Sequence, residues 1–494
     1  MHLFRFSRHI SIVICFISGF PCAQAQEQLG MRLERYSGIY SAALNPANTA
    51  FTPHNWEVSL FNAGYFFENN YAFLKNTSVQ NALRHSDRIV AVSDLSPERP
   101  APADAILLDY VNSNRRIRAL SKALAGGPGF SFRFGGNNVV GVTTGMRADL
   151  SAYRIPSIFH YPQFSEISID QTVDIRPLQL GAMSWGEIGL HYSHSNDDGD
   201  LMRAWGVSPK LLVGYMGGYG KSNLSFLYTP TGQDTATFDN PTWEYGLSGN
   251  LLDSENLGNN AFQVNGMGAG IDIGFSWAAA GDEEGEYRWR AGVSLLDLGF
   301  VRYNRGAEQH LLRLDSLLTI DGNAIRADDG RGYTRVISQL LLGDSLASLQ
   351  KESFSMGLPT ALSAQFDLQV APNIYGSVVA IQRIPLLKIS LRCASTLAVV
   401  PRYERRWFSV SLPVVLNDWQ SLRVGLAARL GWLYLGSDNL GSFFSKNRLS
   451  GTDAYIGLKI NAFTIGSGER RDRLHKERGG GGKQRLRKIK CYKF

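Results

Sequence analysis

Long stretches in which apolar residues alternate with small or polar ones constrain this chain more than any other feature. Residues 264–277 read V-N-G-M-G-A-G-I-D-I-G-F-S-W, so large apolar side chains share one face and Gly, Asp and Ser share the other. Residues 138–150, 420–434 and 453–463 repeat the arrangement. A period of two marks a β-strand and is incompatible with a helix. Several stretches match the 9–11 residues with which a tilted strand crosses a bilayer.

Noisier segments of the same kind bring the total to 15, and turns rich in Gly, Asn, Asp and Pro separate several of them. A bacterial barrel with both termini in the periplasm needs an even number of strands. The segment at 242–250 is the weakest, so we predict about 14 strands. The noisier segments lie at 56–66, 129–135, 178–193, 203–217, 221–229, 242–250, 286–303, 353–370, 373–384, 389–401 and 405–416.

Two all-β classes fit this alternation, a soluble sandwich and a membrane barrel. In a sandwich the apolar face forms the core, whereas in a barrel it faces lipid and the polar face lines the lumen. All nine Trp fall in or beside predicted strands, several at strand ends, where an interfacial girdle would place them. Because no domain linker precedes residue 464, we predict an all-β, transmembrane, antiparallel outer-membrane β-barrel.

The two ends of the chain differ from the strand region. Residues 1–25 have the basic start, apolar run and Ala-Gln-Ala cleavage site of a signal peptide. We therefore expect residues 26–55 to form a periplasmic or hatch segment, residues 56–463 the barrel, and residues 464–494 a flexible tail. That tail carries eleven Lys or Arg from residue 469 onward. Since the basic excess is terminal, it gives no support for nucleic-acid binding. A periplasmic tail would either bind an anionic cell-wall or protein partner or remain a solvated extension.

Two long insertions interrupt the strands, at residues 76–128 and 304–352. Apolar spacing predicts helices over 104–124 and 336–349. A plug, a gate or an extracellular lid would explain such insertions, and so would plain surface loops.

Charged residues on the small-residue faces of the strands are the candidate lumen residues. They carry both signs, which is compatible with a salt-bridged interior and with a selectivity lining. The set is Arg147, Asp149, Glu187, Asp272, Arg288, Arg290, Arg423, Arg429 and Lys459.

Few residues suggest catalysis. His191 and His194 precede an acidic turn at 196–200, but on a strand they point to opposite faces, which spoils a shared metal site or catalytic role. The glycine clusters lie within strands and lack the helix that a nucleotide loop needs. We expect no enzyme activity, metal or cofactor.

Several segments together resemble a known family. Tyr36-Ser37-Gly38 and residues 41–47 resemble the N-terminal segment of outer-membrane barrels related to long-chain fatty-acid transporters. Residues 401–407, 435–440 and 451–460 are similar to an uncharacterised Gram-negative family of this type. The resemblance implies an exported barrel of about 14 strands whose N-terminal segment forms a hatch in the lumen. Asn45, Pro46 and Ala47 would lie in that hatch, although an ordinary Asn-Pro turn also explains them.

On this resemblance we expect a bacterial outer-membrane channel or transporter for hydrophobic or amphipathic small molecules, in contact with outer-membrane lipid. The alternative is a plugged barrel that acts as a structural or secretion-associated scaffold of the envelope.

Overall fold

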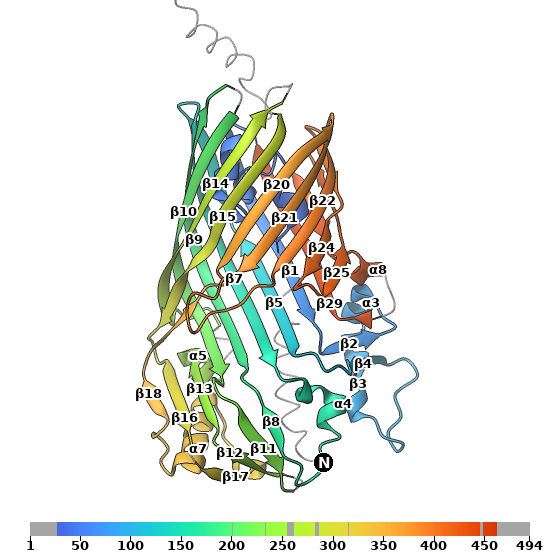
Figure 1. Ribbon diagram of the computed structural model, residues 1–494, viewed down its shortest axis with the longest axis vertical. Coiled ribbons are helices and arrows are strands. Elements are labelled where there is room, and N and C mark those ends of the chain that lie inside the picture. The colour runs from blue at the N-terminus through green and yellow to red at the C-terminus, as the bar shows by residue number, and fades with distance from the viewer. Residues whose placement is uncertain are drawn as a thin grey trace, which may run out of the picture.

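The computed structural model describes residues 27–461 except 200, 233, 254–260, 282–285, 315 and 445–447. The expected signal peptide and basic tail lie outside the described residues. The fold is a single antiparallel sheet that closes on itself, because Trp56–Asn69 (β1) pairs with Gly451–Asn461 (β29) (Figure 1). None of the helices in the described part of the chain has the length and apolarity to cross a membrane.

The wall of this closed barrel has 14 strands, in agreement with the prediction. Four of them are each broken into two by a short irregularity. In chain order the wall strands are β1, β5 and β6 (Ile117–Gly126 and Gly129–Phe134), β7 (Asn138–Ile155), β9 (Gln179–Asp197), β10 (Leu201–Lys221), β14 (Gly266–Ala280), β15 (Tyr287–Tyr303), β19 and β20 (Phe354–Gly357 and Ala361–Ala371), β21 (Ile374–Arg383), β22 (Thr396–Glu404), β23 and β24 (Phe408–Ser411 and Val414–Asn417), β25 and β26 (Ser421–Val424 and Leu426–Leu430), β27 (Leu433–Ser437) and β29.

The strand number is right although two of the 14 retained segments are wrong, and the segment at 242–250, which is the weakest, does lie outside the wall. The segments at 221–229 and 242–250 lie outside the wall: they become β11 (Phe226–Pro230) and β13 (Thr242–Leu247) in the loops. The segment at 420–434 spans two wall strands, because the chain turns at Gly431, whose φ is 61°. Alternation continues on both sides of this turn, so the sequence pattern conceals it.

The outer face of the wall is apolar, as contact with lipid requires, and the inner face is polar, as a lumen requires. On β14, Met267 is 57% exposed and Phe275 49% exposed, whereas Asp272 and Ser276 are almost fully buried. Exposed Trp side chains occur near strand ends, among them Trp56, Trp205 and Trp407. The chain is therefore an outer-membrane-type β-barrel with an apolar exterior and a polar, filled interior.

The two ends of the barrel carry connections of very different length (Figure 1). At the short-turn end, drawn at the top, brief turns such as 134–138, 197–201 and 371–374 join the strands. At the opposite, long-loop end, the connections form two four-stranded sheets. One consists of β8 (Val173–Ile175), β11, β12 (Thr235–Asp239) and β17 (Leu317–Asp321). The other consists of β2 (Ala72–Lys75), β3 (Ile89–Ala91), β4 (Ile106–Tyr110) and β28 (Arg448–Leu449).

The remaining elements at the long-loop end are a hairpin-like extension and short helices. β13 pairs with the end of β10 and with β16 (Glu308–Arg313), and β16 pairs with β18 (Leu349–Lys351). The short helices are α3 (Val79–Arg84), α4 (Tyr161–Phe164), α5 (Gly249–Leu252) and α8 (Gly441–Phe444).

Of the two predicted loop helices, one is wrong and one is displaced. Residues 104–124 form β4 and most of β5, because a register shift between Ile117 and Ala119 disturbs the alternation and imitates helical spacing. The second helix, α7, runs over Gly330–Leu342 rather than 336–349. Asp329 caps its start by accepting a hydrogen bond from the Gly332 amide, and Gly343, with a φ of 78°, ends it.

Candidate functional site

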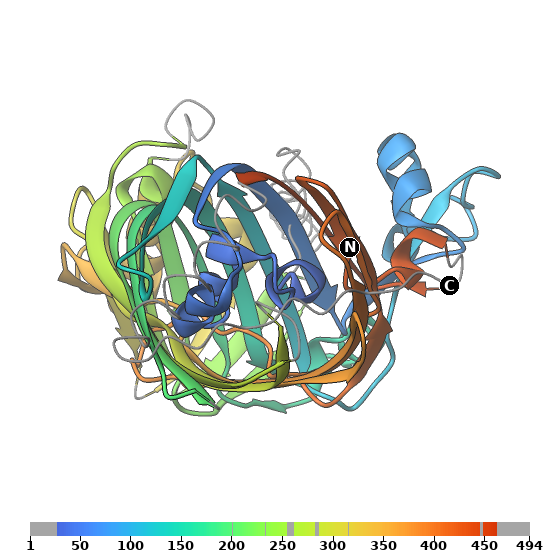
Figure 2. The same ribbon diagram turned by 90° about the horizontal axis from the view of Figure 1, so that it is seen from above.

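The N-terminal segment, residues 27–55, lies inside the barrel, where Figure 2 shows it as the dark blue chain within the ring of strands. It folds into three short helical turns: α2 (Leu29–Arg32), η1 (Gly38–Ala43) and η2 (Pro46–Phe51). Nearly all of its residues are buried, polar ones included. Such burial requires the wall to supply partners for its polar groups.

Asn45, Pro46 and Ala47 form the start of η2 and are fitted into the wall. The Asn45 side chain accepts a hydrogen bond from the Ala47 amide at 3.0 Å and donates to Ser276 Oγ, also at 3.0 Å. On three adjacent strands, the residue that faces this turn is a glycine: Gly206 on β10, Gly274 on β14 and Gly292 on β15. A Cβ at Gly206 would lie 2.6 Å from the carbonyl carbon of Pro46. The small residues of the inner face therefore make room for this turn.

Charged groups also fasten the segment to the wall. Arg429 Nε donates to the Glu34 carboxylate at 2.7 Å, and Arg290 donates to the Leu33 carbonyl at 3.0 Å. Lys459 Nζ is fully buried and donates to the carbonyls of Tyr36 and Ser37 at 2.8 and 2.7 Å, and to Glu57 at 2.7 Å. Removing either partner of such a buried pair leaves an uncompensated charge.

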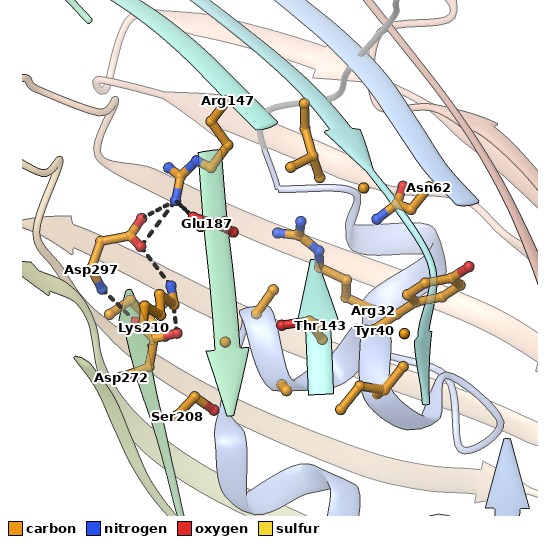
Figure 3. Close-up of a pocket in the computed structure, with 18 of the residues that line it drawn as sticks. Arg32, Tyr40, Asn62, Thr143, Arg147, Glu187, Ser208, Lys210, Asp272 and Asp297 are labelled. Atoms are coloured by element: carbon orange, nitrogen blue, oxygen red, sulfur yellow. Dashed lines mark hydrogen bonds and ion pairs between the residues drawn. The ribbon is translucent and has the colours of Figure 1, made fainter. Parts of the chain in front are cut away.

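A cavity of about 150 Å³ lies between this segment and the surrounding wall strands (Figure 3). Its lining is mixed. Ile39, Leu124 and Leu296 supply apolar surface, while two groups of charged side chains supply the polar surface. The residues of the two groups come from the segment and from β5, β7, β9, β10, β14 and β15.

The first charged group is a network around two cations, and Figure 3 shows its contacts. Arg147 binds Asp297 at 2.9 Å, and Lys210 binds Asp272 at 2.7 Å and Asp297 at 2.8 Å. Two more carboxylates lie at longer range from Arg147, Asp149 at 3.4 Å and Glu187 at 3.7 Å. Four carboxylates thus surround two cations, which leaves an excess of negative charge.

The second charged group has the opposite composition. Glu27 contacts Lys122 at 3.4 Å and Arg32 at 3.8 Å, so two cations share one carboxylate. Arg32 is only 8% exposed, and Figure 3 shows its guanidinium reaching into the middle of the cavity. Within the described chain, its buried Nε has no hydrogen-bond partner.

A second segment enters the lumen from the long-loop end. This strap, residues 384–395, connects β21 to β22. Its backbone bridges to β19, where the Gly357 amide donates to the Ile389 carbonyl at 2.8 Å. Leu391 is buried, and Arg392 donates to Gln179 on β9 at 3.0 Å. Cys393, also buried, lines the cavity.

The cavity also reaches an irregularity in the wall. Gly127 and Pro128 separate β5 from β6, and at the same level β1 shifts its register with β29 between Ser59 and Phe61. Gly127 and Gly129 both line the cavity. Because proline has no amide hydrogen, this level of the wall has fewer strand-to-strand hydrogen bonds than an unbroken ladder would provide.

The nine predicted lumen residues have four different placements in the structure. Arg147, Asp149, Glu187 and Asp272 line the cavity, whereas Arg290, Arg429 and Lys459 hold the N-terminal segment or its neighbours. Arg423 instead pairs with Glu68 at 3.2 Å, away from the cavity lining. Arg288 does not fit the expectation: its side chain is exposed beside the hairpin turn and donates to the Ala280 carbonyl, because β14 and β15 shift register there.

Several residues that matter at the cavity were not among the predicted ones. Lys210 lies two residues after Ser208 on β10, so both side chains point into the lumen. The alternation of this strand could therefore have identified Lys210. Asp297 could not be found in this way, because its positive φ of 51° marks a bulge in β15. At this bulge the set of positions that point into the lumen shifts by one residue. Arg32 and Glu27 lie in the N-terminal segment, which has no strand period.

The two histidines point to opposite faces of β9, as strand geometry requires. His191 is buried in the lumen, with Nε2 at 2.7 Å from Thr49 Oγ1 and Nδ1 at 2.9 Å from Ser208 Oγ. His194 instead contacts Asn138 Oδ1 at 2.9 Å. Asp200, at the end of the acidic turn, lies outside the described residues.

Comparison with known proteins gives a family and a set of distant structural likenesses. Residues 46–438 match the model of a family described as "Family of unknown function (DUF5723)". No curated protein matches the chain. Among solved structures, the TodX deltaS2S3 mutant monoaromatic hydrocarbon channel is 10% identical, with a TM-score of 0.40 over 86% of this chain and 95% of that one. The Ralstonia pickettii toluene transporter TbuX is 10% identical, with a TM-score of 0.37 over 90% and 96%. A Pseudomonas aeruginosa FadL homologue is 8% identical, with a TM-score of 0.30 over 89% and 98%.

Proposed function

We propose that this chain, which belongs to the DUF5723 family of unknown function, is a gated outer-membrane channel for small amphipathic molecules. One observation carries the proposal. The lumen contains a cavity with a mixed apolar and ionic lining, enclosed between two segments that are attached to the wall by non-covalent contacts. A barrel that served only as a support would have no need of a charged internal cavity, because buried charges are costly unless they are used or fully paired.

The lining favours amphipathic over purely hydrophobic solutes. A hydrocarbon passing through the cavity would cover charged groups such as Arg147 and Lys210 without offering them a partner, which costs free energy. A molecule with a polar end and a short apolar part would match both the ionic groups and side chains such as Ile39 and Leu296.

The two enclosing segments act as gates in this proposal. The N-terminal segment is the hatch at the short-turn end, and Asn45, Pro46 and Ala47 fix it against the wall. The strap is the gate at the long-loop end. Because short turns face the periplasm and long loops the exterior in bacterial barrels, the hatch would be periplasmic, and so would the tail at residues 464–494. The break at residues 127–128 offers a lateral exit into the membrane.

A reversible disulfide tests the hatch. Thr49 Oγ1 and Ser193 Oγ lie 2.7 Å apart, so the pair Thr49→Cys and Ser193→Cys suits a cross-link between hatch and wall. In proteoliposomes, we expect oxidation of this double variant to lower the flux of small amphipathic solutes, and reduction to restore it. The single variants serve as controls, because neither can form the link. Equal flux in the oxidised and reduced states would contradict a moving hatch.

The scaffold alternative has one observation in its favour. The β2–β4–β3–β28 sheet and its helices project sideways from the barrel (Figure 2), and Leu83 and Phe444 there are 74% and 75% exposed. Exposed apolar side chains of this size favour a contact with another molecule. Co-purification with and without Leu83→Ser and Phe444→Ser tests it, and the same comparison after deletion of residues 466–494 tests a partner of the tail. An unchanged set of partners in both comparisons would contradict the scaffold.

A further inference from the structure

We propose that the cavity is a binding site for a small zwitterion, a molecule that carries an oxyanion such as a carboxylate at one end and an ammonium group at the other. The inference rests on the proposed channel function and adds the chemical class of the solute. It follows from three properties of the cavity: the separation of its charges, the incomplete pairing of Arg32, and its size.

The charges of the lining are divided into two unlike groups. Around Arg32, two cations share the Glu27 carboxylate through contacts of 3.4 and 3.8 Å, both longer than a strong charge-assisted hydrogen bond. Around Arg147, four carboxylates share two cations, and Glu187 is the one held most loosely, since Asp149 also faces Lys122, its register partner on β5. One side of the cavity therefore has spare capacity for an anion, and the other for a cation.

Arg32 gives the strongest sign of a missing partner. Its side chain is about nine-tenths buried, its Nε has no hydrogen-bond partner in the described structure, and its head group extends into the cavity. A buried guanidinium usually satisfies its donors, and its planar fork fits a carboxylate or another oxyanion. Lys122 lies beside the same Glu27 and would add a second positive charge to that end of the site.

The opposite end suits an ammonium group. Asp149 and Glu187 project from the neighbouring strands β7 and β9, whose backbones pair directly. Both line the cavity, and Glu187, whose contact to Arg147 is 3.7 Å, has a carboxylate able to accept further hydrogen bonds, whereas Asp149 also faces Lys122 on β5. Asp272 and Asp297 are already held by Lys210 at 2.7 and 2.8 Å, so they are less available.

The size of the cavity restricts the ligand. A volume of about 150 Å³ is the size of a protein cavity that holds one benzene molecule, so a ligand of roughly six or seven non-hydrogen atoms fits. The apolar side chains Ile39, Leu124 and Leu296 can cover a short methylene chain between the two charged ends. 4-Aminobutyrate has these properties and serves as the probe.

Equilibrium binding tests the site on the full chain in detergent micelles, by calorimetry with four probes of similar length. We expect 4-aminobutyrate to bind more tightly than butyrate, butylamine or 1,4-butanediol. Arg32→Gln should weaken 4-aminobutyrate and butyrate about tenfold or more but leave butylamine unchanged. Glu187→Gln should weaken 4-aminobutyrate and butylamine but leave butyrate unchanged. Arg32→Lys should retain only part of the affinity, because it keeps the charge but loses the planar fork.

Control variants and flux measurements separate this site from the channel itself. Arg203→Gln removes an exposed arginine of β10 that does not line the cavity, and it should change no affinity. Opposite effects of the Arg32 and Glu187 variants on butyrate and butylamine cannot arise from general misfolding. Wild-type protein that binds no 4-aminobutyrate, or binds butanediol equally well, overturns the zwitterion site. Binding without any flux that depends on the hatch disulfide would overturn the channel but leave the site.

Discussion

The two segments that enclose the cavity differ in how they are attached. The N-terminal segment is anchored by buried charges: Glu34 to Arg429, and the carbonyls of Tyr36 and Ser37 to Lys459. The strap is attached by hydrogen bonds, from its backbone to Gly357, Ser151 and Asp418 and from the Arg392 side chain to Gln179. Its second half is buried, whereas Leu386 and Leu387 in its first half are exposed. A segment held by buried ion pairs opens at a high free-energy cost, whereas one held mainly by hydrogen bonds opens at a lower cost. We infer that the strap moves first.

The largest expected effect concerns Lys459. Lys459→Met should destabilise the folded barrel by about 3–5 kcal/mol, because Glu57 and two backbone carbonyls lose their partner in a buried site. Equilibrium unfolding in urea with detergent micelles measures this. Lys351→Met, at an exposed position in the loops, is the matched control and should stay within about 0.5 kcal/mol. Similar losses in the two variants would show that the anchoring of the segment is weaker than its contacts suggest.

The second-largest expected effect concerns the place where the Asn-Pro-Ala turn packs against the wall. In Gly206→Val, the added Cβ would lie 2.6 Å from the carbonyl carbon of Pro46. We expect this clash to lower the free energy of unfolding by about 1–3 kcal/mol and to dislodge η2. Protease cleavage within residues 45–52 should accelerate. Gly376→Val on β21, where the nearest side chain lies 3.9 Å from the added Cβ, should leave cleavage unchanged. Slow cleavage in the Gly206 variant would mean that the turn is held by contacts elsewhere.

A smaller effect tests the strap. Arg392→Ala removes the hydrogen bond to Gln179 and the packing on the Tyr153 ring, which together contribute roughly 1–2 kcal/mol. Opening of the strap exposes Cys393, so in a Cys491→Ser background the rate of maleimide labelling should rise about tenfold. Arg288→Ala, which removes an exposed arginine at the short-turn end, should not alter the rate. An unaffected rate in the Arg392 variant would assign the closure of the strap to its backbone contacts.

The smallest expected effect concerns an ion pair in the loops, outside the lumen. Burial raises the pKa of Asp109, but hydrogen bonds from Lys75 and the Tyr110 amide, with the Lys75 charge, bring the pKa below its ordinary value. A lowered pKa stabilises the fold above about pH 4, and this contribution is lost as the pH falls further. Because Lys75 is 43% exposed, we expect only a few tenths of a kcal/mol. Hydrogen exchange of β2 and β4 at pH 7 and pH 3 measures it. Lys75→Met should reduce the difference.

The alternation of apolar and polar residues in the sequence predicts the strands of the wall well. It identifies only some of the residues that point into the lumen. Where a strand is regular, as in β14, parity alone places Asp272 inside and Phe275 outside. Where a strand bulges, parity fails: Asp297 turns inward and Arg288 remains at the surface. The N-terminal segment has no period, so its position came from resemblance alone and its contacts from the structure. Charge pairs such as Glu34 with Arg429 join residues almost 400 positions apart, which no local pattern can reveal.

The bonds of Lys459 bear on how the barrel is assembled. This residue lies on the last strand, yet it binds the N-terminal segment and, through Glu57, the first strand. Lys459 therefore couples the seam between the first and last strands to the seating of the N-terminal segment, so each stabilises the other. A change that loosens this one side chain should therefore weaken both ends of the chain together.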